Sequence, residues 1–347
     1  MNRHELLEWL RTDDPRSLQR LWRLADAARK KHVGDAVHLR GLLEISNYCS
    51  RACWYCGLRG GRRGLKRYRM TRAEIEACVR QLAAFGYGTV VLQSGEDPGL
   101  APERISRLVA WIKAHTALAV TLSLGEQPRA VLRQWREAGA DRYLLRIETT
   151  NRRLLARIHP GEPHGSRMTQ LRWLRQLGYE VGSGIMVGIP GQTYDMLVKD
   201  LLWFKTMDLD MIGIGPFIPH PDTPLFALRR KKPPAPGQVP ATEIMVNKVV
   251  ALARLMCPEA NLPATTALAS INAVSGREQA LSHGANVVMP NVTPQQYRVL
   301  YDIYPGKACV SETAEVCHAC IRRRIEKLGR TIGSGPGGRV KRKSGVR

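Results

Sequence analysis

Three cysteines at CxxxCxxC spacing are the residues of this chain best suited to chemistry. Cys49, Cys53 and Cys56 follow an apolar run that ends at Ser46. A 4Fe-4S cluster held by three thiolates keeps one iron without a protein ligand, and that iron can chelate a small molecule and pass it an electron. Zinc would need a fourth ligand, and no histidine lies within this loop. The spacing predicts such a cluster; a zinc knuckle or three buried structural thiols is the minor alternative.

A second group of three cysteines lies near the C-terminus. Cys309, Cys317 and Cys320 have the spacing CxxxxxxxCxxC. Three thiolates and a water or outside ligand can hold a second 4Fe-4S or a 2Fe-2S cluster near the surface. Zinc or free thiols remain the alternative at this position. Cys78 and Cys257 are interpreted as core thiols or as thiols without a functional role.

The chain is long enough for one large α/β barrel or two ordinary domains. It has 347 residues, of which 44% are hydrophobic, so it can bury a sizeable core. No uninterrupted apolar run reaches the roughly 18 residues that span a bilayer, and acidic residues interrupt the apolar stretch at the N-terminus, unlike a signal peptide. We therefore expect a soluble, cytoplasmic protein that does not bind a membrane. In that compartment, cysteines are better explained as metal ligands and core thiols than as disulfides.

The net charge of +23 is the unusual feature of the composition. No RNA- or DNA-binding motif accompanies the basic residues, and only 6% of the residues are aromatic, so nucleic acid is not the expected partner. We interpret the charge mainly as an arginine-rich solvated surface, with an acidic protein partner as the second explanation. The basic residues are densest in Arg59 to Arg69, Arg229 to Lys232, Arg322 to Arg324 and Arg339 to Lys343.

Extended apolar runs alternate with amphipathic helical patterns along the chain. Eight runs have the length and composition of buried strands: Leu42–Ser46, Thr89–Gln93, Ala117–Leu122, Arg142–Ile147, Gly182–Val187, Met211–Ile214, Pro263–Leu268 and Asn286–Met289. Thr71 is the expected N-cap of the first helix between them. The predicted helices are Arg72–Phe85, Pro102–His115, Arg129–Ala138, Arg167–Leu177, Thr193–Met207 and Ala241–Met256.

This alternation predicts an α/β fold of the (β/α)8 barrel type. Residues 1–38 would form an N-terminal helical extension and 39–304 the barrel. Residues 305–332 would form a C-terminal cap with the second cysteine triplet, and 333–347 a disordered basic tail.

Polar and glycine-rich groups follow the predicted strands, which is where a barrel places its active residues. The cysteine loop follows the first strand. Similar groups follow the next five, at 94–97, 123–126, 148–151, 188–192 and 215–224, and Thr265 with Thr266 falls within the seventh. The convergence predicts one site at the mouth of the barrel.

The chain resembles a known family at this point. The cysteine triplet, with Tyr55 before its third cysteine, resembles the radical S-adenosylmethionine (SAM) superfamily. Further runs are similar to the HydE family of FeFe-hydrogenase maturases, and the likeness covers about residues 35 to 338. These runs are Leu92–Pro98, Ala140–Arg146, Met186–Thr193, Gly213–Pro224, Pro263–Ala267 and Gly284–Asn291. The second cysteine triplet matches a peripheral cluster site that some members of that family have.

The resemblance implies a set of residues around SAM. The amino and carboxylate groups of SAM would chelate the fourth iron, and an electron from the reduced cluster would break the sulfonium bond to give a 5'-deoxyadenosyl radical. Backbone carbonyls near Gly95 would accept from the methionine ammonium, Glu148 from ribose hydroxyls, and Arg167 would pair with the methionine carboxylate. The expected cofactor set is Tyr55, Ser94, Gly95, Glu96, Glu148, Arg167 and Met186.

A second set is expected to bind substrate. If Arg146 points into the barrel, its guanidinium needs an anionic partner, and a substrate carboxylate would satisfy it; the alternative is an ion pair with Asp141. The family assigns Thr265, Thr266 and Tyr304 to the same cavity. Of the neighbouring tyrosines, Tyr297 and Tyr301 are expected to be packing residues. His220 is either a ligand or proton carrier, or a satisfied core histidine.

The resemblance also implies substrate and partners. The substrate would be a cysteine-bound iron complex carrying CO and cyanide, delivered by a HydG-type maturase and used with a HydF-type maturase in assembly of the diiron site. Reduced ferredoxin or flavodoxin would donate electrons. One alternative is a mutase or sulfur-inserting enzyme of the methylornithine synthase or biotin synthase type. The other is a cluster- or zinc-containing nucleic-acid-binding protein.

Overall fold

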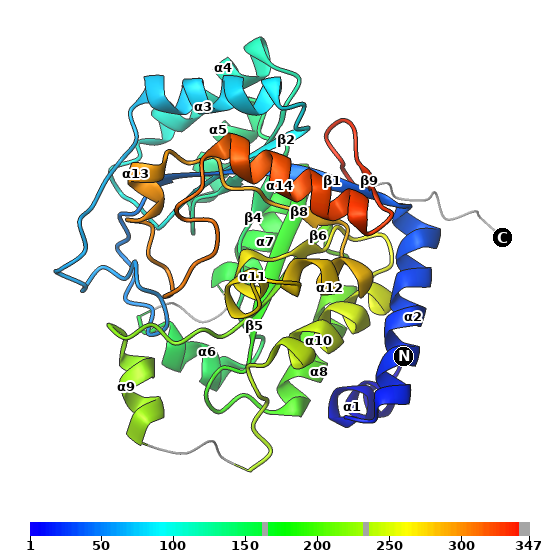
Figure 1. Cartoon of the computed structure of the whole chain (residues 1–347). Helices are drawn as coiled ribbons and strands as arrows, with labels where there is room; N and C mark the ends of the chain where they lie inside the picture. Colours follow the sequence, from blue (N-terminus) through cyan, green and yellow to red (C-terminus); the bar gives the residue numbers. More distant parts are fainter. Residues whose placement is uncertain (162–165, 232–235, 340–347) are drawn as a thin grey trace.

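Eight parallel strands form a nearly closed barrel in the computed structural model, which describes residues 1–161, 166–231 and 236–339 (Figure 1). The strands are β1 (Ala36–Ser46), β2 (Thr89–Ser94), β3 (Ala119–Ser123), β4 (Arg142–Leu144), β5 (Glu180–Val187), β6 (Met211–Pro216), β7 (Pro263–Ala264) and β8 (Val287–Val288). Their order is β6-β5-β4-β3-β2-β1-β8-β7, and a short β9 (Thr331–Ile332) pairs with β1. β6 meets the segment before β7 where Ile212 N–H donates to Asn261 O at 3.0 Å. The predicted (β/α)8 barrel is confirmed.

The helices surround the barrel (Figure 1). Thr71 caps α3 as predicted: its hydroxyl accepts from Glu74 N–H at 3.3 Å while the Glu74 carboxylate accepts from Thr71 N–H at 2.7 Å. No helix in the described ranges is long and apolar enough to cross a membrane. The helices are α1 (Arg3–Arg11), α2 (Pro15–Val33), α3 (Arg72–Ala84), α4 (Pro102–His115), α5 (Arg129–Glu137), α6 (Arg152–Ile158), α7 (Ser166–Gln176), α8 (Tyr194–Thr206), α9 (Pro224–Lys231), α10 (Glu243–Met256), α11 (Thr266–Ile271), α12 (Gly276–Ser282), α13 (Gln295–Arg298) and α14 (Ala314–Lys327).

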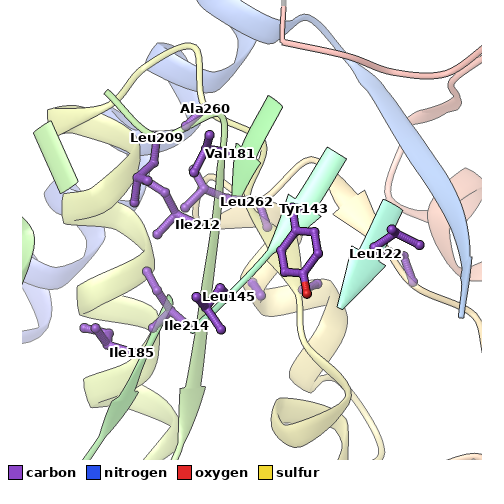
Figure 2. Packing of buried hydrophobic residues seen from close by; sticks show 14 of the residues in the cluster. Leu122, Tyr143, Leu145, Val181, Ile185, Leu209, Ile212, Ile214, Ala260 and Leu262 are labelled. Carbon is purple, nitrogen blue, oxygen red and sulfur yellow. The ribbon is translucent and has the colours of Figure 1, made fainter. Parts of the chain in front are cut away.

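The strands are covered on both faces, which is why their sequences are continuous apolar runs and do not alternate between apolar and polar residues. All of β6 and seven of the eight residues of β5 are buried. Figure 2 shows Leu122, Tyr143, Ile185 and Ile212, from four different strands, within one hydrophobic cluster. α2 packs against α10 and α1 against α8 (Figure 1), so the N-terminal helices cover one side of the barrel wall.

The seventh strand is shorter than predicted. It ends at Ala264, and Thr265, with φ −71° and ψ 152°, is the extended N-cap residue of α11, which begins at Thr266. The Ala-Leu-Ala that follows has high helix propensity, whereas the Thr265 side chain makes no capping hydrogen bond and donates to Ile214 O instead. Local propensity therefore ends the strand four residues early. As a result the two threonines lie at the mouth of the barrel instead of inside a strand.

Residues 333–339, which the sequence placed in a disordered tail, pack across the other end of the barrel. Pro336 O accepts from Arg142 Nη2 at 3.0 Å, and Gly337 O accepts from Arg40 Nη2 at 2.9 Å. A Cβ on Gly337 would lie 2.4 Å from a histidine ring of β1, so this glycine permits close packing rather than flexibility. The prediction is wrong for these residues, because glycine content alone does not reveal a long-range contact. The rest of the predicted tail, 340–347, lies outside the described residues.

Candidate active site

A cavity of about 340 Å³ lies at the carboxyl ends of the barrel strands. The carboxyl ends are where a (β/α)8 barrel carries its chemistry. Two of the three predicted cluster cysteines, Cys49 and Cys56, line it. So do all four predicted substrate residues, Arg146, Thr265, Thr266 and Tyr304. Of the predicted cofactor set, Tyr55, Ser94, Gly95, Glu148 and Met186 line it, whereas Glu96 and Arg167 lie behind its wall.

The cysteine loop connects the cavity with the surface. Cys53 is buried, and Cys49 and Cys56 are half-buried. Burial raises the pKa of all three thiols, to about 12 for Cys56, and the neighbouring thiols raise that of Cys53 further. Binding of a metal must therefore displace protons that the protein alone would keep on the sulfurs. The loop is held by Ser50 N–H, which donates to Glu96 O at 2.9 Å.

The donor set fits an iron-sulfur cluster. In the described part of the chain no three His, Cys, Asp or Glu side chains have the geometry that holds a single metal ion. A 4Fe-4S cluster makes a different demand, because each thiolate binds a different iron and the sulfurs lie farther apart. Three neighbouring thiols on one loop, two of them at the cavity edge, meet that demand.

Gly95 brings the second βα loop against the cysteine loop. A Cβ at this position would lie 2.4 Å from Tyr48 O and 2.6 Å from Cys49 Cβ. Only glycine fits such an approach without a shift of backbone. The sequence predicted a close backbone approach here toward a ligand, and the group that lies closest in the structure is the cysteine loop itself.

Arg146 has an anionic partner inside the protein. Its Nε donates to Glu148 Oε1 and its Nη2 to Glu148 Oε2, both at 3.0 Å. Further bonds run from Nη2 to Ile185 O at 2.6 Å and from Nη1 to Gly213 O at 3.1 Å. Burial alone would lower the pKa of Arg146, but the negative charge of Glu148 outweighs it, so the pKa is raised. Of the five N–H donors of a guanidinium, one on Nη1 is left for a ligand.

This pairing replaces the alternative partner that the sequence suggested. Asp141 pairs instead with Lys113, with Nζ 3.1 Å from Oδ2. Arg146 and Glu148 lie beyond the end of β4, and the pair forms across the turn of the backbone at Glu148. Glu148 has a φ of +60°, which is rare for a non-glycine residue and shows that its position at the strand end is enforced by its surroundings.

Arg167 lies in a group of alternating charges beside the cavity. Its Nε lies 3.1 Å from Glu126 Oε1, and its Nη1 donates to Arg146 O at 2.6 Å. Arg51 contacts the same carboxylate at 2.7 Å and Glu96 at 3.1 Å. Two guanidiniums thus share two carboxylates directly behind the cysteine loop. Arg167 and Glu96, both predicted at the cofactor, belong to this group.

His159 is a site residue that the sequence did not reveal. Its Nδ1 lies 3.2 Å from Cys53 Sγ, and its Nε2 lies 3.0 Å from Tyr55 Oη. Burial and then the positive charge of Arg167 lower the pKa of the imidazole well below its usual value, so it is neutral. A lone histidine at the end of a short helix carries no sequence signal for such a contact.

A buried ion pair also lines the cavity without having been predicted. Lys307 Nζ lies 3.0 Å from Glu44 Oε1, and Asn291 Nδ2 donates to Glu44 Oε2 at 3.0 Å. Lys307 Nζ also donates to Tyr301 O at 2.9 Å, and Tyr301 itself lines the cavity. An acid in the middle of the apolar strand β1 was the available signal for Glu44. Burial raises the pKa of this carboxyl.

The remaining candidates divide between the cavity and the core. Thr265 Oγ1 donates to Ile214 O at 3.3 Å, and burial raises the pKa of Tyr304. For His220 the sequence left two interpretations, a ligand or proton carrier and a core histidine with its hydrogen bonds satisfied. The structure agrees with the second, because His220 is 3% exposed and its Nε2 lies 3.0 Å from Asp302 Oδ2. Tyr297 stacks on an aromatic neighbour at 4.6 Å, as expected of a packing residue.

The second cysteine triplet lies at the N-terminal half of α14. Cys309 precedes the helix with a φ of +61°, and Cys317 and Cys320 lie on it. Both Nη atoms of Arg277 lie 3.5 Å from Cys309 Sγ. A hydrogen bond from the Cys317 thiol lowers the pKa of Cys309 to about 5, and burial opposes this. Arg277 lies where it can stabilise negative charge on the Cys309 sulfur.

Comparison with known proteins agrees with this geometry. The sequence profile of the Radical SAM superfamily matches residues 43–204. The chain is 51% identical over 337 residues to the [FeFe] hydrogenase maturase subunit HydE of Thermotoga maritima, covering 97% of this chain and 93% of that protein. It is 30% identical to the 3-methylornithine synthase of Methanosarcina barkeri, covering 84% and 79%.

Solved structures share the fold. The crystal structure of methylornithine synthase (PylB) superimposes with a TM-score of 0.81 at 26% identity, covering 96% of this chain and 94% of that one. That of HydG, a maturase of the [FeFe]-hydrogenase, gives a TM-score of 0.74 at 18% identity, covering 95% and 71%, and shows the fold alone. Because it is 51% identical to a HydE protein over almost its whole length, the chain belongs to the HydE family of FeFe-hydrogenase maturases within the radical SAM superfamily.

Proposed function

We propose that this enzyme uses a cluster on Cys49, Cys53 and Cys56 to cleave SAM, and that the radical acts on a cysteine-bound iron complex carrying CO and cyanide. The observation that carries the proposal is the cavity, which is lined by two of the cysteines and also by Arg146 and Thr265. A ligand bound there reaches from a metal-binding loop to groups that recognise a carboxylate.

Cofactor binding is assigned to residues around the cysteine loop. The family implies a 4Fe-4S cluster and SAM; when bound, the cluster supplies one electron that breaks the sulfonium C–S bond, giving methionine and a 5'-deoxyadenosyl radical. Carbonyls of Ser94 to Glu96 accept from the methionine ammonium. Glu148 accepts from the ribose hydroxyls. Met186 and Tyr55, which pack in one apolar cluster, flank the nucleoside.

Arg167 is proposed to pair with the methionine carboxylate. Because its Nε is held by Glu126, this role requires that the ligand compete with a carboxylate already present. His159 bridges Cys53 and Tyr55, so it holds the loop and the tyrosine in a fixed relation. Their common contact fixes the wall against which SAM binds.

Substrate binding is assigned to the far wall of the cavity. The free N–H of Arg146 donates to the carboxylate of the cysteine moiety, and Thr265 and Thr266 add hydroxyl or amide donors. Tyr304 closes the same wall. The ion pair of Glu44 and Lys307 forms the neighbouring part of the cavity wall. Its two charges cancel, so it offers polar contacts to a ligand without adding net charge.

The partners follow from this role. A HydG-type maturase supplies the iron complex, a HydF-type maturase takes part in assembly of the product, and reduced ferredoxin or flavodoxin supplies electrons in the cytoplasm. Cys309, Cys317 and Cys320 are proposed to hold a second, peripheral cluster that the radical step does not need. Its three thiols lie on and before α14, away from the cavity lining.

The test is anaerobic reconstitution with iron, sulfide and SAM. We expect 5'-deoxyadenosine to form, and its yield to rise when a synthetic cysteine-bound iron–CO–cyanide complex is consumed. The methylornithine synthase and biotin synthase alternative predicts turnover of a metal-free amino acid or thiol substrate and none of the iron complex. No 5'-deoxyadenosine at all would refute radical SAM chemistry.

A further inference from the structure

The segment from Arg59 to Arg69 carries more positive charge than the carboxylates of the described residues neutralise. It holds six cations in eleven residues. Arg62 and Arg69 are paired, with Asp302 and Asp97 respectively, at 2.7 Å each. Within the ranges that the structure describes, no carboxylate is recorded within 4.0 Å of the other four, which are Arg59, Arg63, Lys66 and Arg67.

This cationic segment lies directly on the cysteine loop. Gly60 N–H donates to Arg51 O at 2.8 Å, and a Cβ on Gly60 would lie 2.9 Å from Cys49 O. Arg67 Nη1 donates to Leu58 O and its Nη2 to Arg59 O, both at 2.8 Å. The positive charge is therefore fixed against the backbone that carries the cluster ligands.

The segment is held in a defined shape. Arg62 reaches Asp222 at 2.8 Å in addition to Asp302, so one end is pinned to the barrel mouth. Arg69 makes a bidentate contact to Asp97, with distances of 2.8 and 2.7 Å, at the other end. Between these anchors Arg63 and Lys66 are exposed, and so are Ser50 and Ala52 of the neighbouring cysteine loop.

We propose that the cationic segment and the exposed edge of the cysteine loop form the docking surface for a small acidic one-electron carrier protein. The proposal rests on the proposed function, which requires one electron per SAM cleaved. The inner side of the loop faces the cavity, so the electron must enter from the outer side. Electron transfer slows steeply with distance, and complementary charge both steers a partner to a surface and fixes its orientation there.

The electron count is simple. A reduced 2Fe-2S ferredoxin gives up one electron and leaves oxidised, and the cluster bound by Cys49, Cys53 and Cys56 takes that electron up. No proton or bond is exchanged between the two proteins. Other parts of the surface also carry cations, but this segment continues directly from the cysteine loop and bonds back to it through Gly60.

The test compares two double variants of the reconstituted, full-length enzyme. Arg63→Glu with Lys66→Glu reverses two charges in the segment. Arg107→Glu with Arg133→Glu reverses two exposed charges on α4 and α5 as a matched control. The rate of cluster reduction is followed by bleaching of its visible absorption at low salt, with reduced 2Fe-2S ferredoxin or with dithionite.

We expect the ferredoxin rate of the segment variant to fall about tenfold or more and to lose most of its salt dependence, since steering contributes roughly 10- to 1000-fold. The control variant keeps the wild-type rate. With dithionite, all three proteins are reduced equally. A milder variant, Arg63→Gln with Lys66→Gln, should give an intermediate rate and guards against misfolding of the charge reversal.

Two results would overturn the proposal. One is an equal loss of the ferredoxin rate in the control variant. The other is an unchanged ferredoxin rate in the segment variants; if these variants then lose DNA binding at the same salt, the segment is assigned to nucleic acid. Because cluster reduction is read without SAM, a wild type that is reduced but cleaves no SAM would refute the proposed function and leave the docking surface supported.

Discussion

Replacement of Arg146 by glutamine tests how the cavity binds a carboxylate. A charge-assisted hydrogen bond in a buried site contributes about 1.5 to 3 kcal/mol net, so affinity for a cysteine-based ligand should fall by between one and two powers of ten. SAM should weaken as well, because Glu148, with a side chain 6% exposed, loses its bidentate partner. For SAM we expect a loss of only about threefold, clearly below that for the cysteine-based ligand.

The assay is a pair of anaerobic titrations, one with SAM and one with the cysteine-based ligand, into wild type and variant. Arg133→Gln, an exposed position on α5, is the matched control and should change neither affinity. The double variant with Glu148→Gln should lose less SAM affinity than the two single losses combined, since the groups act as one unit. An unchanged affinity for the cysteine-based ligand would refute the assignment, and equal losses of both ligands would mean that Arg146 serves the SAM site or the fold.

Three further predictions follow from the site and the barrel. Replacing Cys309, Cys317 and Cys320 together by serine should lower the iron content per chain while SAM cleavage continues; a folded variant without cleavage would show that the second triplet is needed for the radical step. Gly95→Ala should reduce cluster occupancy, measured as iron and sulfide per chain, because its Cβ would meet backbone at 2.4 Å; full occupancy would contradict the packing argument. Burial raises the pKa of Asp200 to about 7, so the protonated native form contributes stability below the unfolded pKa that is lost as pH rises through about 7. Asp200→Asn should therefore raise the melting temperature more at pH 8.5 than at pH 5.5, and an equal shift at both pH values would contradict the raised pKa.

The barrel could be predicted because its signals are local. Buried parallel strands appear as apolar runs, and the helices between them carry caps such as Thr71 and apolar residues at helical spacing. The strand ends could not be predicted as well. At Thr265, the helix propensity of the residues that follow competes with strand propensity, and only the packed structure shows which prevails.

The site was predictable where its residues belong to short motifs. Cys49, Cys56 and residues that follow most of the strands line one cavity, as the sequence indicated, whereas Cys53 and residues 188–192 after β5 do not line it. Residues brought in by long-range contacts were missed: His159 reaches Cys53 from a different loop, and Lys307 reaches the cavity from the C-terminal segment.

The most direct test of the account is SAM cleavage by Cys53→Ala beside wild type, both reconstituted under the same anaerobic conditions and reduced with dithionite. Loss of one of three thiolates should prevent assembly of the cluster, while the 51% identity to a HydE maturase predicts that wild type is active. The account predicts 5'-deoxyadenosine from wild type and none from Cys53→Ala. Retained 5'-deoxyadenosine formation in a folded Cys53→Ala protein would contradict it.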